Sequence, residues 1–244
     1  MDGSNAIAAL ETYGPPVLFG YLVGSIPFGL LITKLAGLGD IRAIGSGNIG
    51  ATNVLRTGRR DLALATLVLD AGKAGCAFLI CLYYGLFVAS FAHSGQVGDT
   101  EVAQRQLEAA SSCDAYSIGL IGGAFAFVGH CFPVWLKFKG GKGVATFLGL
   151  ILAAMWQVGL GFGFIWLLTV AVFRMSSLAG LLATLATPIM AYVLNPVGEG
   201  WIITSVLAAL IFWRHRANIA RILSGSEPKI GAKKKADDLQ DPAG

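Results

Sequence analysis

The sequence has little charge and little cysteine. Only 13% of its 244 residues are charged, whereas 55% are hydrophobic, and the mean hydropathy is +0.68. The apolar runs are longer than a soluble core helix requires, so we expect lipid to surround most of the chain. The formal charge of +4 is modest and does not indicate a nucleic-acid partner.

The four cysteines form no CxxC pair, and neither they nor the three histidines have the spacing of a metal site. We therefore expect no metal and no other cofactor. Cys76, Cys81 and Cys131 lie in apolar segments, where cysteine packs as a small apolar residue. Only Cys113 lies in a polar segment.

Long apolar segments take up most of the chain. One crossing takes about 20 residues, so the longest of the later segments, 144–173, is either one tilted helix or two short ones. Two short helices, with a break near 157–163, give seven spans and place the basic loops on one face, in agreement with the positive-inside rule. The apolar segments cover residues 15–33, 62–92, 116–136, 144–173, 177–194 and 200–213.

We therefore predict an all-α, polytopic membrane bundle of seven transmembrane helices, with the N-terminus outside and the C-terminus in the cytoplasm. All but two of the 18 Lys and Arg residues then lie at the cytoplasmic face; the exceptions are Lys73, in an apolar segment, and Arg105, outside. The first 14 residues carry acids and no cations, unlike a cleaved signal peptide, so the first apolar segment is expected to remain as an anchor.

The predicted divisions follow from these spans. Residues 1–14 form an external tail, 15–224 form the membrane domain, and 225–244 form a cytoplasmic tail. Within the membrane domain, residues 92–116 form an external polar loop, whose central part around 101–110 is able to form a short helix. The C-terminal tail mixes Lys, Asp, Pro and Gly, a composition typical of disorder. A monomer is expected.

A polar, glycine-rich and basic run, GSGNIGATNVLRTGRR at residues 45–60, interrupts the apolar sequence. Its backbone amides, hydroxyls, side-chain amides and guanidinium groups suit an anion site at the membrane surface. Arg56 is suited to bidentate binding of a phosphate. The other candidate binding residues of this run are Ser46, Gly47, Asn48 and Asn53.

A second basic run with glycines is KFKGGKG at residues 137–143. Glycine lets backbone N–H groups approach an anion closely, lysine supplies charge, and a helix is expected to begin directly afterwards. The spacing is not that of a Walker loop, and no strand precedes it. The candidate binding residues are Lys139, Gly140, Gly141, Lys142 and Gly143.

Two more polar runs reach the same face, RMSS at 174–177 and WRHRANIAR at 213–221. In the second run, His215 and Asn218 are three residues apart on a helix and share a face. Two anion loops imply either one ligand with several phosphates or two ligands with one phosphate each. Basic residues beside a membrane also determine topology or contact lipid head groups, but that does not explain the Ser and Asn residues near residue 50.

Four runs carry a resemblance to a known family: GSIPFG at 24–29, GSGNIGATNVLRTG at 45–58, GHCFPVWLKFKGGKGVAT at 129–146 and WRHRANIARILSGSEPKIG at 213–231. In this order they resemble the bacterial acyl-phosphate-dependent glycerol-3-phosphate acyltransferases, seven-helix inner-membrane enzymes with a cytoplasmic active site. The resemblance implies transfer of a fatty acyl group from acyl phosphate to the sn-1 hydroxyl of glycerol 3-phosphate. The products would be lysophosphatidic acid and phosphate, in the first acylation step of phospholipid synthesis.

The resemblance also implies roles for residues. Lys139 would stabilise charge on the acyl phosphate, and Ser46 would orient an oxygen atom. The base for the glycerol hydroxyl would be either His215 or an oxygen of a substrate phosphate, and we favour the phosphate. The residues expected to line the active site are Ser46, Arg56, Lys139, Ser177, His215 and Asn218.

Two motifs of covalent or histidine-based transfer are absent. No histidine is followed five residues later by Asp, and there is no GxSxG sequence for a serine nucleophile. Acyl phosphate is a mixed anhydride with a good leaving group, so the barrier left to lower is mainly orientation and charge. We therefore expect direct transfer without an acyl-enzyme.

Several interpretations stay open. Asp70 and Lys73 lie three apart in an apolar segment and form either a structural pair or a support for the site, and His130 is expected to be a packed, hydrogen-bonded histidine. An organophosphate transporter would hold its cations near the bilayer centre, whereas nearly all cations here fall on one face. A phosphatidyl-type transferase would need a cluster of acidic metal ligands, which the sequence lacks.

Overall fold

The computed structural model describes residues 3–45, 47–94 and 101–231, with side chains in 10–45, 47–90 and 115–231. Over these residues it is built from helices, which confirms the predicted all-α membrane fold. Two apolar helices are shorter than a full crossing, Val144–Ala154 and Gly200–Arg214. Five segments are long and apolar enough to cross a membrane: Leu10–Leu35, Arg60–Ser90, Ala115–Leu136, Trp156–Phe173 and Ser176–Leu194.

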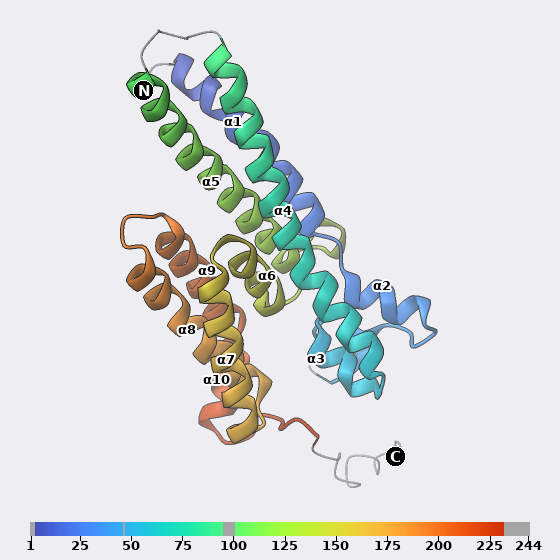
Figure 1. Cartoon of the computed structure of the whole chain (residues 1–244). Helices are drawn as coiled ribbons and strands as arrows, with labels where there is room; N and C mark the ends of the chain where they lie inside the picture. The colour runs from blue at the N-terminus through green and yellow to red at the C-terminus, as the bar shows by residue number, and fades with distance from the viewer. Residues whose placement is uncertain (1–2, 46, 95–100, 232–244) are drawn as a thin grey trace, which may run out of the picture.

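The first apolar segment is bent. α1 (Gly3–Gly24) ends shortly before α2 (Phe28–Leu35), which turns to the side in Figure 1. Pro27 lies at the bend. Proline lacks the N–H group that a helix interior needs and disfavours helical backbone in the residue before it, so the helix is interrupted here. Gly20 and Gly24 let α1 pack closely on α5, since a Cβ atom at either would overlap the backbone of that helix.

α4 (Arg60–Ser94) and α5 (Glu101–Cys131) are the longest helices, and with α1 they extend beyond the other helices at one end (Figure 1). The 35 residues of α4 measure about 52 Å at 1.5 Å per residue. The first turns of α5 fall in the segment 92–116, so the helix around 101–110 is continuous with the membrane-spanning part. Similarly, residues 3–14 of the predicted N-terminal tail form the first turns of α1.

α6 (Val144–Ala154) and α7 (Trp156–Phe173) confirm that the segment 144–173 contains two helices. The break lies at Met155, whose φ of −143° and ψ of 72° are not helical, and the predicted position near 157–163 is wrong. Gly159 lies inside α7, where it lets the helix approach Leu152: a Cβ atom at Gly159 would lie 2.6 Å from that side chain. This glycine therefore serves close packing and does not end a helix.

α8 (Ser176–Leu194) and α9 (Gly200–Arg214) form the last pair, and α10 (Arg216–Leu223) follows. Beyond α10, residues 225–231 return to the start of α8, where the N–H of Ile230 donates to the carbonyl of Arg174 and the Arg174 guanidinium donates to the carbonyl of Ile230. The prediction of disorder from Gly225 is therefore wrong for 225–231, and residues 232–244 lie outside the described residues. The short helices are η1 (Ile41–Ala43), α3 (Ala51–Val54), η2 (Leu55–Thr57) and η3 (Val134–Leu136).

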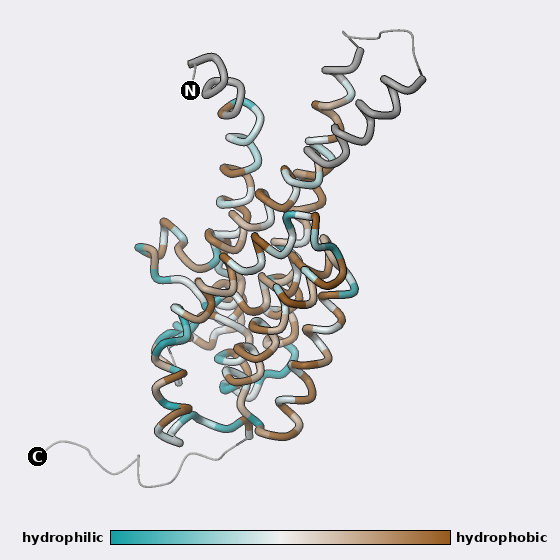
Figure 2. Tube along the Cα trace, turned by 90° about the vertical axis from the view of Figure 1, so that its left-hand side faces the viewer, coloured by the Kyte–Doolittle hydropathy of each residue, from teal (hydrophilic) through white to brown (hydrophobic). Residues whose placement is uncertain are grey.

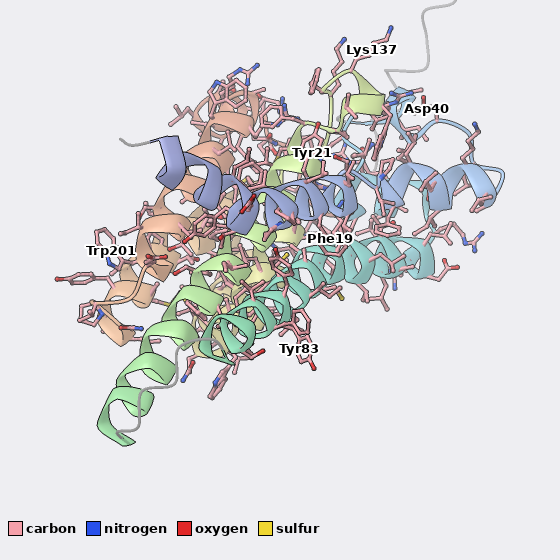
Figure 3. All side chains as sticks on the ribbon, turned by 90° about the horizontal axis from the view of Figure 1, so that it is seen from above. Phe19, Tyr21, Asp40, Tyr83, Lys137 and Trp201 are labelled. Atoms are coloured by element: carbon pink, nitrogen blue, oxygen red, sulfur yellow. The ribbon has the colours of Figure 1, made fainter. Side chains whose placement is uncertain are left out.

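The centre of the bundle is apolar and aromatic. Phe127, Phe147 and Phe162, from α5, α6 and α7, pack edge to face with ring centroids 6.4 and 6.0 Å apart. Other large apolar side chains face outward, as expected in lipid; Figure 3 shows Tyr83 pointing away from the bundle. Hydrophilic segments gather near the end that carries residues 225–231 (Figure 2).

Candidate active site

A cavity of about 560 Å³ lies between the first glycine-rich run, the starts of α6 and α8, the junction of α9 with α10, and residues 225–231. Both polar and apolar side chains line its wall. The apolar side chains are Ala51, Leu67, Val144, Ala145, Leu148, Phe162, Trp166, Leu167 and Pro228. The polar side chains are Asn48, Thr52, Asn53, Arg56, Asp70, His130, Lys142, Ser176, Ser177, His215, Asn218, Arg221 and Glu227.

The first glycine-rich run folds around Asn53. The buried amide of Asn53 donates to the carbonyls of Ile41 at 2.9 Å and Ile44 at 3.0 Å, which fixes the preceding loop. Gly45 has a φ of +58°, and a Cβ atom there would press on the guanidinium of Arg56. Among the described side chains Arg56 has no hydrogen-bond or ion-pair partner, so its guanidinium is available to an anion in the cavity.

Two glycine amides of the second glycine-rich loop, those of Gly140 and Gly141, bond to the protein itself. The N–H of Gly140 donates to the carbonyl of Cys131, and the N–H of Gly141 donates to that of His130. The carbonyls of the same two glycines accept hydrogen bonds from the guanidinium of Arg214 at 2.7 and 3.1 Å. The expectation that these two N–H groups approach an anion is therefore wrong, because they attach the loop to the end of α5.

This attachment precedes Lys142, which lies in the wall of the cavity and donates to the side-chain oxygen of Asn218. Burial, together with the neighbouring cations Arg221 and Arg214, lowers the pKa of Lys142 to about 8. Lys139, three residues earlier, is exposed and does not line the cavity. Of the lysines in this loop, Lys142 is thus the one that lines the cavity.

Two helices begin at the cavity. Gly143 and the first residues of α6 line one side, and Ser176 and Ser177 at the start of α8 line another. The first N–H groups of a helix have no partner within the helix, and the helix dipole makes this end positive. The wall therefore carries two positive helix ends in addition to its cationic side chains, an arrangement suited to two phosphates.

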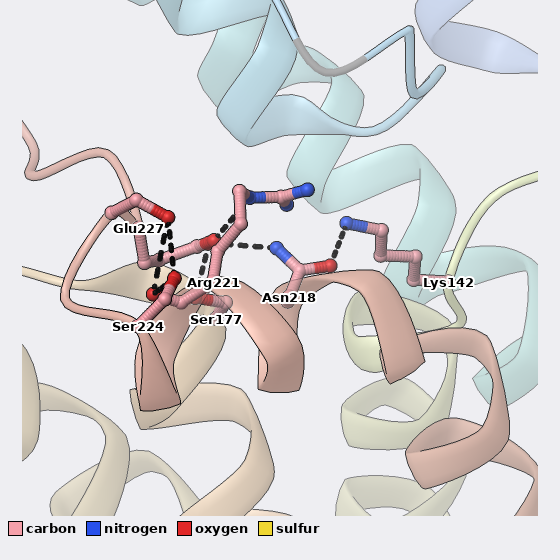
Figure 4. Close-up of polar contacts among 7 residues, drawn as sticks. Lys142, Ser177, Asn218, Arg221, Ser224 and Glu227 are labelled. Atoms are coloured by element: carbon pink, nitrogen blue, oxygen red, sulfur yellow. Dashed lines mark hydrogen bonds and ion pairs between the residues drawn. The ribbon is translucent and has the colours of Figure 1, made fainter.

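Glu227 reaches the cavity from the segment 225–231 and joins three of its residues (Figure 4). One carboxylate oxygen accepts hydrogen bonds from Ser177 Oγ and Asn218 Nδ2, both at 2.6 Å, and the other accepts from Arg221 Nε at 2.8 Å. Burial raises the pKa of Glu227, but these hydrogen bonds outweigh it and hold the pKa below its ordinary value. The ionised carboxylate therefore fixes the positions of three groups that line the cavity.

His215 lies buried at the junction of α9 and α10. Its Nδ1 lies 2.8 Å from the carbonyl oxygen of Ile211, so Nδ1–H donates this bond and Nε2 keeps its lone pair. Burial lowers the pKa of His215 to about 4, with Lys142 acting in the same direction. The imidazole is therefore neutral at pH 7 and accepts hydrogen bonds at Nε2.

A buried ionic cluster also borders the cavity. Lys73 Nζ lies 2.9 Å from Asp70 Oδ1, 2.8 Å from His130 Nδ1 and 3.0 Å from the carbonyl oxygen of Ile26. These contacts join α4, α5 and the bend between α1 and α2. Asp70 and His130 also line the cavity, so the pair predicted at residues 70 and 73 has a structural role and lies at the site.

The structure brings most of the predicted site residues around one cavity. Glu227 and Arg221 were not predicted; the signal available for Glu227 is one acid in the otherwise basic run after α10. Ser46 lies outside the described residues. Of the other predicted residues, those that do not line the cavity are Gly47, Lys139, Gly140 and Gly141, and those that do are Asn48, Asn53, Arg56, Lys142, Gly143, Ser177, His215 and Asn218.

Comparisons with known proteins identify the family of the chain. Residues 16–225 match the family model described as glycerol-3-phosphate acyltransferase. The glycerol-3-phosphate acyltransferase of Maricaulis maris is 54% identical, over 88% of this chain and 86% of the relative. That of Rhodospirillum rubrum is 52% identical, over 96% of this chain and 98% of the relative.

Two solved structures have the same fold. The crystal structure of PlsY (YgiH), an integral membrane glycerol 3-phosphate acyltransferase, in its glycerol 3-phosphate form is 33% identical, with a TM-score of 0.73 over 93% of this chain and 98% of that chain. The lysophosphatidic acid form is also 33% identical, with a TM-score of 0.70 over 88% and 94%. This chain belongs to the glycerol-3-phosphate acyltransferase family of integral membrane enzymes.

Proposed function

We propose that this chain transfers a fatty acyl group from acyl phosphate to the sn-1 hydroxyl of glycerol 3-phosphate, which gives lysophosphatidic acid and inorganic phosphate. The observation that carries the proposal is a single cavity lined by both cationic and apolar side chains. Both substrates bear a phosphate, which the cationic side chains suit, and one bears an acyl chain, which the apolar side chains suit. The activity of the relatives supports glycerol 3-phosphate as the acceptor.

The polar part of the cavity holds the two phosphates. Arg56 and Lys142 supply positive charge, and the guanidinium of Arg56, which has no partner among the described side chains, suits bidentate contact with one phosphate. The first turns of α6 and α8 add N–H donors and the positive ends of two helix dipoles. Ser177 and Asn218, which Glu227 fixes in place, orient the bound oxygens.

The apolar part holds the acyl chain. Leu67 on α4 and Leu167 on α7 both line the cavity, yet they are 40% and 64% exposed. The cavity therefore reaches the outer surface of these helices, which lipid covers in a bilayer. The acyl chain enters sideways from the membrane without crossing water.

Transfer is direct, without an acyl-enzyme. The sn-1 oxygen attacks the carbonyl carbon of acyl phosphate, the bond from that carbon to the phosphate oxygen breaks, and the phosphate leaves with the bonding electrons. The hydroxyl proton passes to an oxygen of a substrate phosphate. Lys142 offsets the charge that develops on the departing phosphate, and the site contributes mainly orientation and charge.

A substrate phosphate serves as the base because His215 is hard to protonate, with its pKa at about 4. Nε2 of His215 instead accepts a hydrogen bond from the sn-1 hydroxyl and orients it. The variant His215→Gln retains a hydrogen-bond acceptor, so we expect its kcat to fall by less than about 100-fold. Loss of a general base lowers kcat by about 100-fold or more. A loss near 10,000-fold at saturating substrates would identify His215 as the base.

We further propose that all seven apolar helices cross the bacterial inner membrane, with the N-terminus outside and the cavity at the cytoplasmic face, and that a monomer suffices. The basic segments of the chain gather at the end with the cavity, which supports a cytoplasmic location under the positive-inside rule. α1 begins at the opposite end of the molecule (Figure 1).

The reaction is tested with purified protein, palmitoyl phosphate and labelled glycerol 3-phosphate, in the presence of a metal chelator. We expect lysophosphatidic acid and phosphate in equal amounts. A parallel reaction contains palmitoyl-CoA in place of palmitoyl phosphate. Product only from the thioester would overturn the proposed donor, and uptake of label into vesicles without any product would indicate a transporter.

A further inference from the structure

Lys73 has three acceptors for its three ammonium hydrogens. They are Asp70 Oδ1, the carbonyl oxygen of Ile26 and Nδ1 of His130, at 2.8 to 3.0 Å. All three side chains of the cluster are at most 4% exposed. A charged lysine donates all of these bonds, so Nδ1 of His130 takes part as an acceptor.

This contact determines the tautomer of His130. A neutral imidazole carries one proton, and because Nδ1 accepts a bond from Lys73, the proton is on Nε2. A second proton on Nδ1 would point at the ammonium, so the ring stays neutral. Nε2 has no hydrogen-bond partner among the described residues. It lies beside Gly141, where a Cβ atom would overlap it, and His130 lines the cavity.

The charge around His130 differs from that in the rest of the cavity. Asp70 and Lys73 cancel one another, so this buried cluster adds no net charge to the wall. Arg214, which lies nearby, donates to the carbonyls of Gly140 and Gly141 and does not line the cavity. Near Arg56 and Lys142, by contrast, the wall carries positive charge that attracts a phosphate. A neutral N–H donor on an uncharged wall suits an oxygen that is neutral in the bound substrate and gains negative charge as the reaction proceeds. The carbonyl oxygen of the acyl donor has this property.

We propose that His130 donates a hydrogen bond from Nε2 to the carbonyl oxygen of the acyl phosphate, and that Asp70 and Lys73 are positioning residues that fix its tautomer. This inference rests on the proposed function. The proton stays on Nε2 throughout, and the bond strengthens as the carbonyl oxygen becomes an oxyanion.

The test compares His130→Leu, which removes the donor, with His130→Gln, whose amide N–H reaches about as far as Nε2. We expect His130→Leu to lower kcat by about 100- to 1,000-fold with the KM for glycerol 3-phosphate unchanged, and His130→Gln to recover at least tenfold of that loss. Tyr21→Phe is the matched control, because it removes a hydrogen bond to the carbonyl of Phe132 near the same end of α5 without altering the cavity. It is expected to keep the wild-type kcat.

A second measurement does not depend on turnover. The chain has three histidines, so ¹⁵N spectra of histidine-labelled protein are assignable with single His→Gln variants. We expect the Nε2–H tautomer at His130, and a shift of its Nε2 signal when a non-hydrolysable acyl methylenephosphonate, which keeps the carbonyl, is added.

Three results would overturn the inference: the Nδ1–H tautomer, no response to the analogue, or normal kcat in a folded His130→Leu protein. A wild-type protein that does not use palmitoyl phosphate would instead overturn the proposed function. In that case the tautomer measurement still reports whether Lys73 fixes the ring.

Discussion

At the level of single residues, Arg56 is the cation of the cavity with the least competition from the protein, since it has no partner among the described side chains. Arg56→Ala removes charge-assisted bonds of about 1.5 to 3 kcal/mol. We expect the KM for glycerol 3-phosphate to rise about 10- to 100-fold, measured by steady-state kinetics. Arg42→Ala is the control, because Arg42 is exposed, pairs with Asp40 and lies outside the cavity. An unchanged KM in Arg56→Ala would remove this residue from the phosphate site.

The lowered pKa of Lys142 predicts that the activity depends on pH. Its pKa of about 8 lies below the ordinary value for lysine because of burial, so the ammonium loses its proton, and the phosphate site loses charge, as the pH rises through 8. We expect kcat/KM, which reports the free enzyme, to fall above pH 8. In Lys142→Arg the guanidinium stays charged, so this fall is expected to move to higher pH.

Lys139→Ala decides between the two lysines. The family resemblance gives the active-site role to Lys139, whereas the structure exposes Lys139 and places Lys142 in the cavity wall. We expect Lys139→Ala to keep most of kcat and the wild-type pH profile, and Lys142→Ala to lower kcat. The reverse ranking would favour Lys139.

The predicted and observed site residues differ for a physical reason. Ser177, His215 and Asn218 were predictable because polar groups at the ends of apolar helices have to meet on one face. The choice between Lys139 and Lys142 was not, because Lys137 and Phe138 have φ values of 53° and 62°. Two successive left-handed residues turn the chain, so spacing no longer shows which side chain faces the cavity.

At the level of helices, Gly149 determines how closely α6 approaches α4. A Cβ atom there would overlap the carbonyl oxygen of Ala71, which is backbone and has little freedom to move. We expect Gly149→Ala to destabilise the protein by about 1 to 3 kcal/mol through overpacking, seen as a lower unfolding temperature. Gly72→Ala is the control: a Cβ atom there has nothing within 4 Å, so it should be neutral or slightly stabilising. Equal stability in both variants would contradict this packing role.

Helix existence was more predictable than helix boundaries. Hydropathy located the long apolar segments, because lipid demands them. The prediction of two helices in residues 144–173 came from charge placement and not from hydropathy. The sequence placed the helix break near 157–163, whereas it lies at Met155. The glycines near the predicted break serve close packing in a membrane helix and do not end the helix. The position of residues 225–231 was missed because it depends on Glu227, whose hydrogen bond to Ser177 joins residues 50 apart in the sequence.

For the whole molecule, the seven-span proposal predicts the sidedness of two exposed positions. Asn195 lies between α8 and α9, and Lys229 follows α10. In a cysteine-free background, we expect Asn195→Cys to react with a membrane-impermeant maleimide in intact spheroplasts. Lys229→Cys should react only after permeabilisation. A single crossing by residues 144–173 would reverse this pattern.

The overall architecture was predictable to a useful degree. An all-helical membrane bundle with a polar, basic end follows from composition and charge placement, because both depend on the solvent around the chain. The extension of α1, α4 and α5 beyond the other helices was not predicted, because the sequence of residues 101–114 is polar and hydropathy alone ends the apolar segment before them.

The exposure of Leu67 and Leu167 at the cavity wall has a kinetic consequence. In the proposed reaction, phosphate leaves into water while lysophosphatidic acid leaves into the bilayer, so the two products separate into different phases after each turnover. The acyl donor is also confined to the bilayer, so other lipids dilute it within the plane of the membrane. Saturation with acyl phosphate should therefore follow its mole fraction in the membrane, and added inert lipid should slow the enzyme at constant bulk concentration.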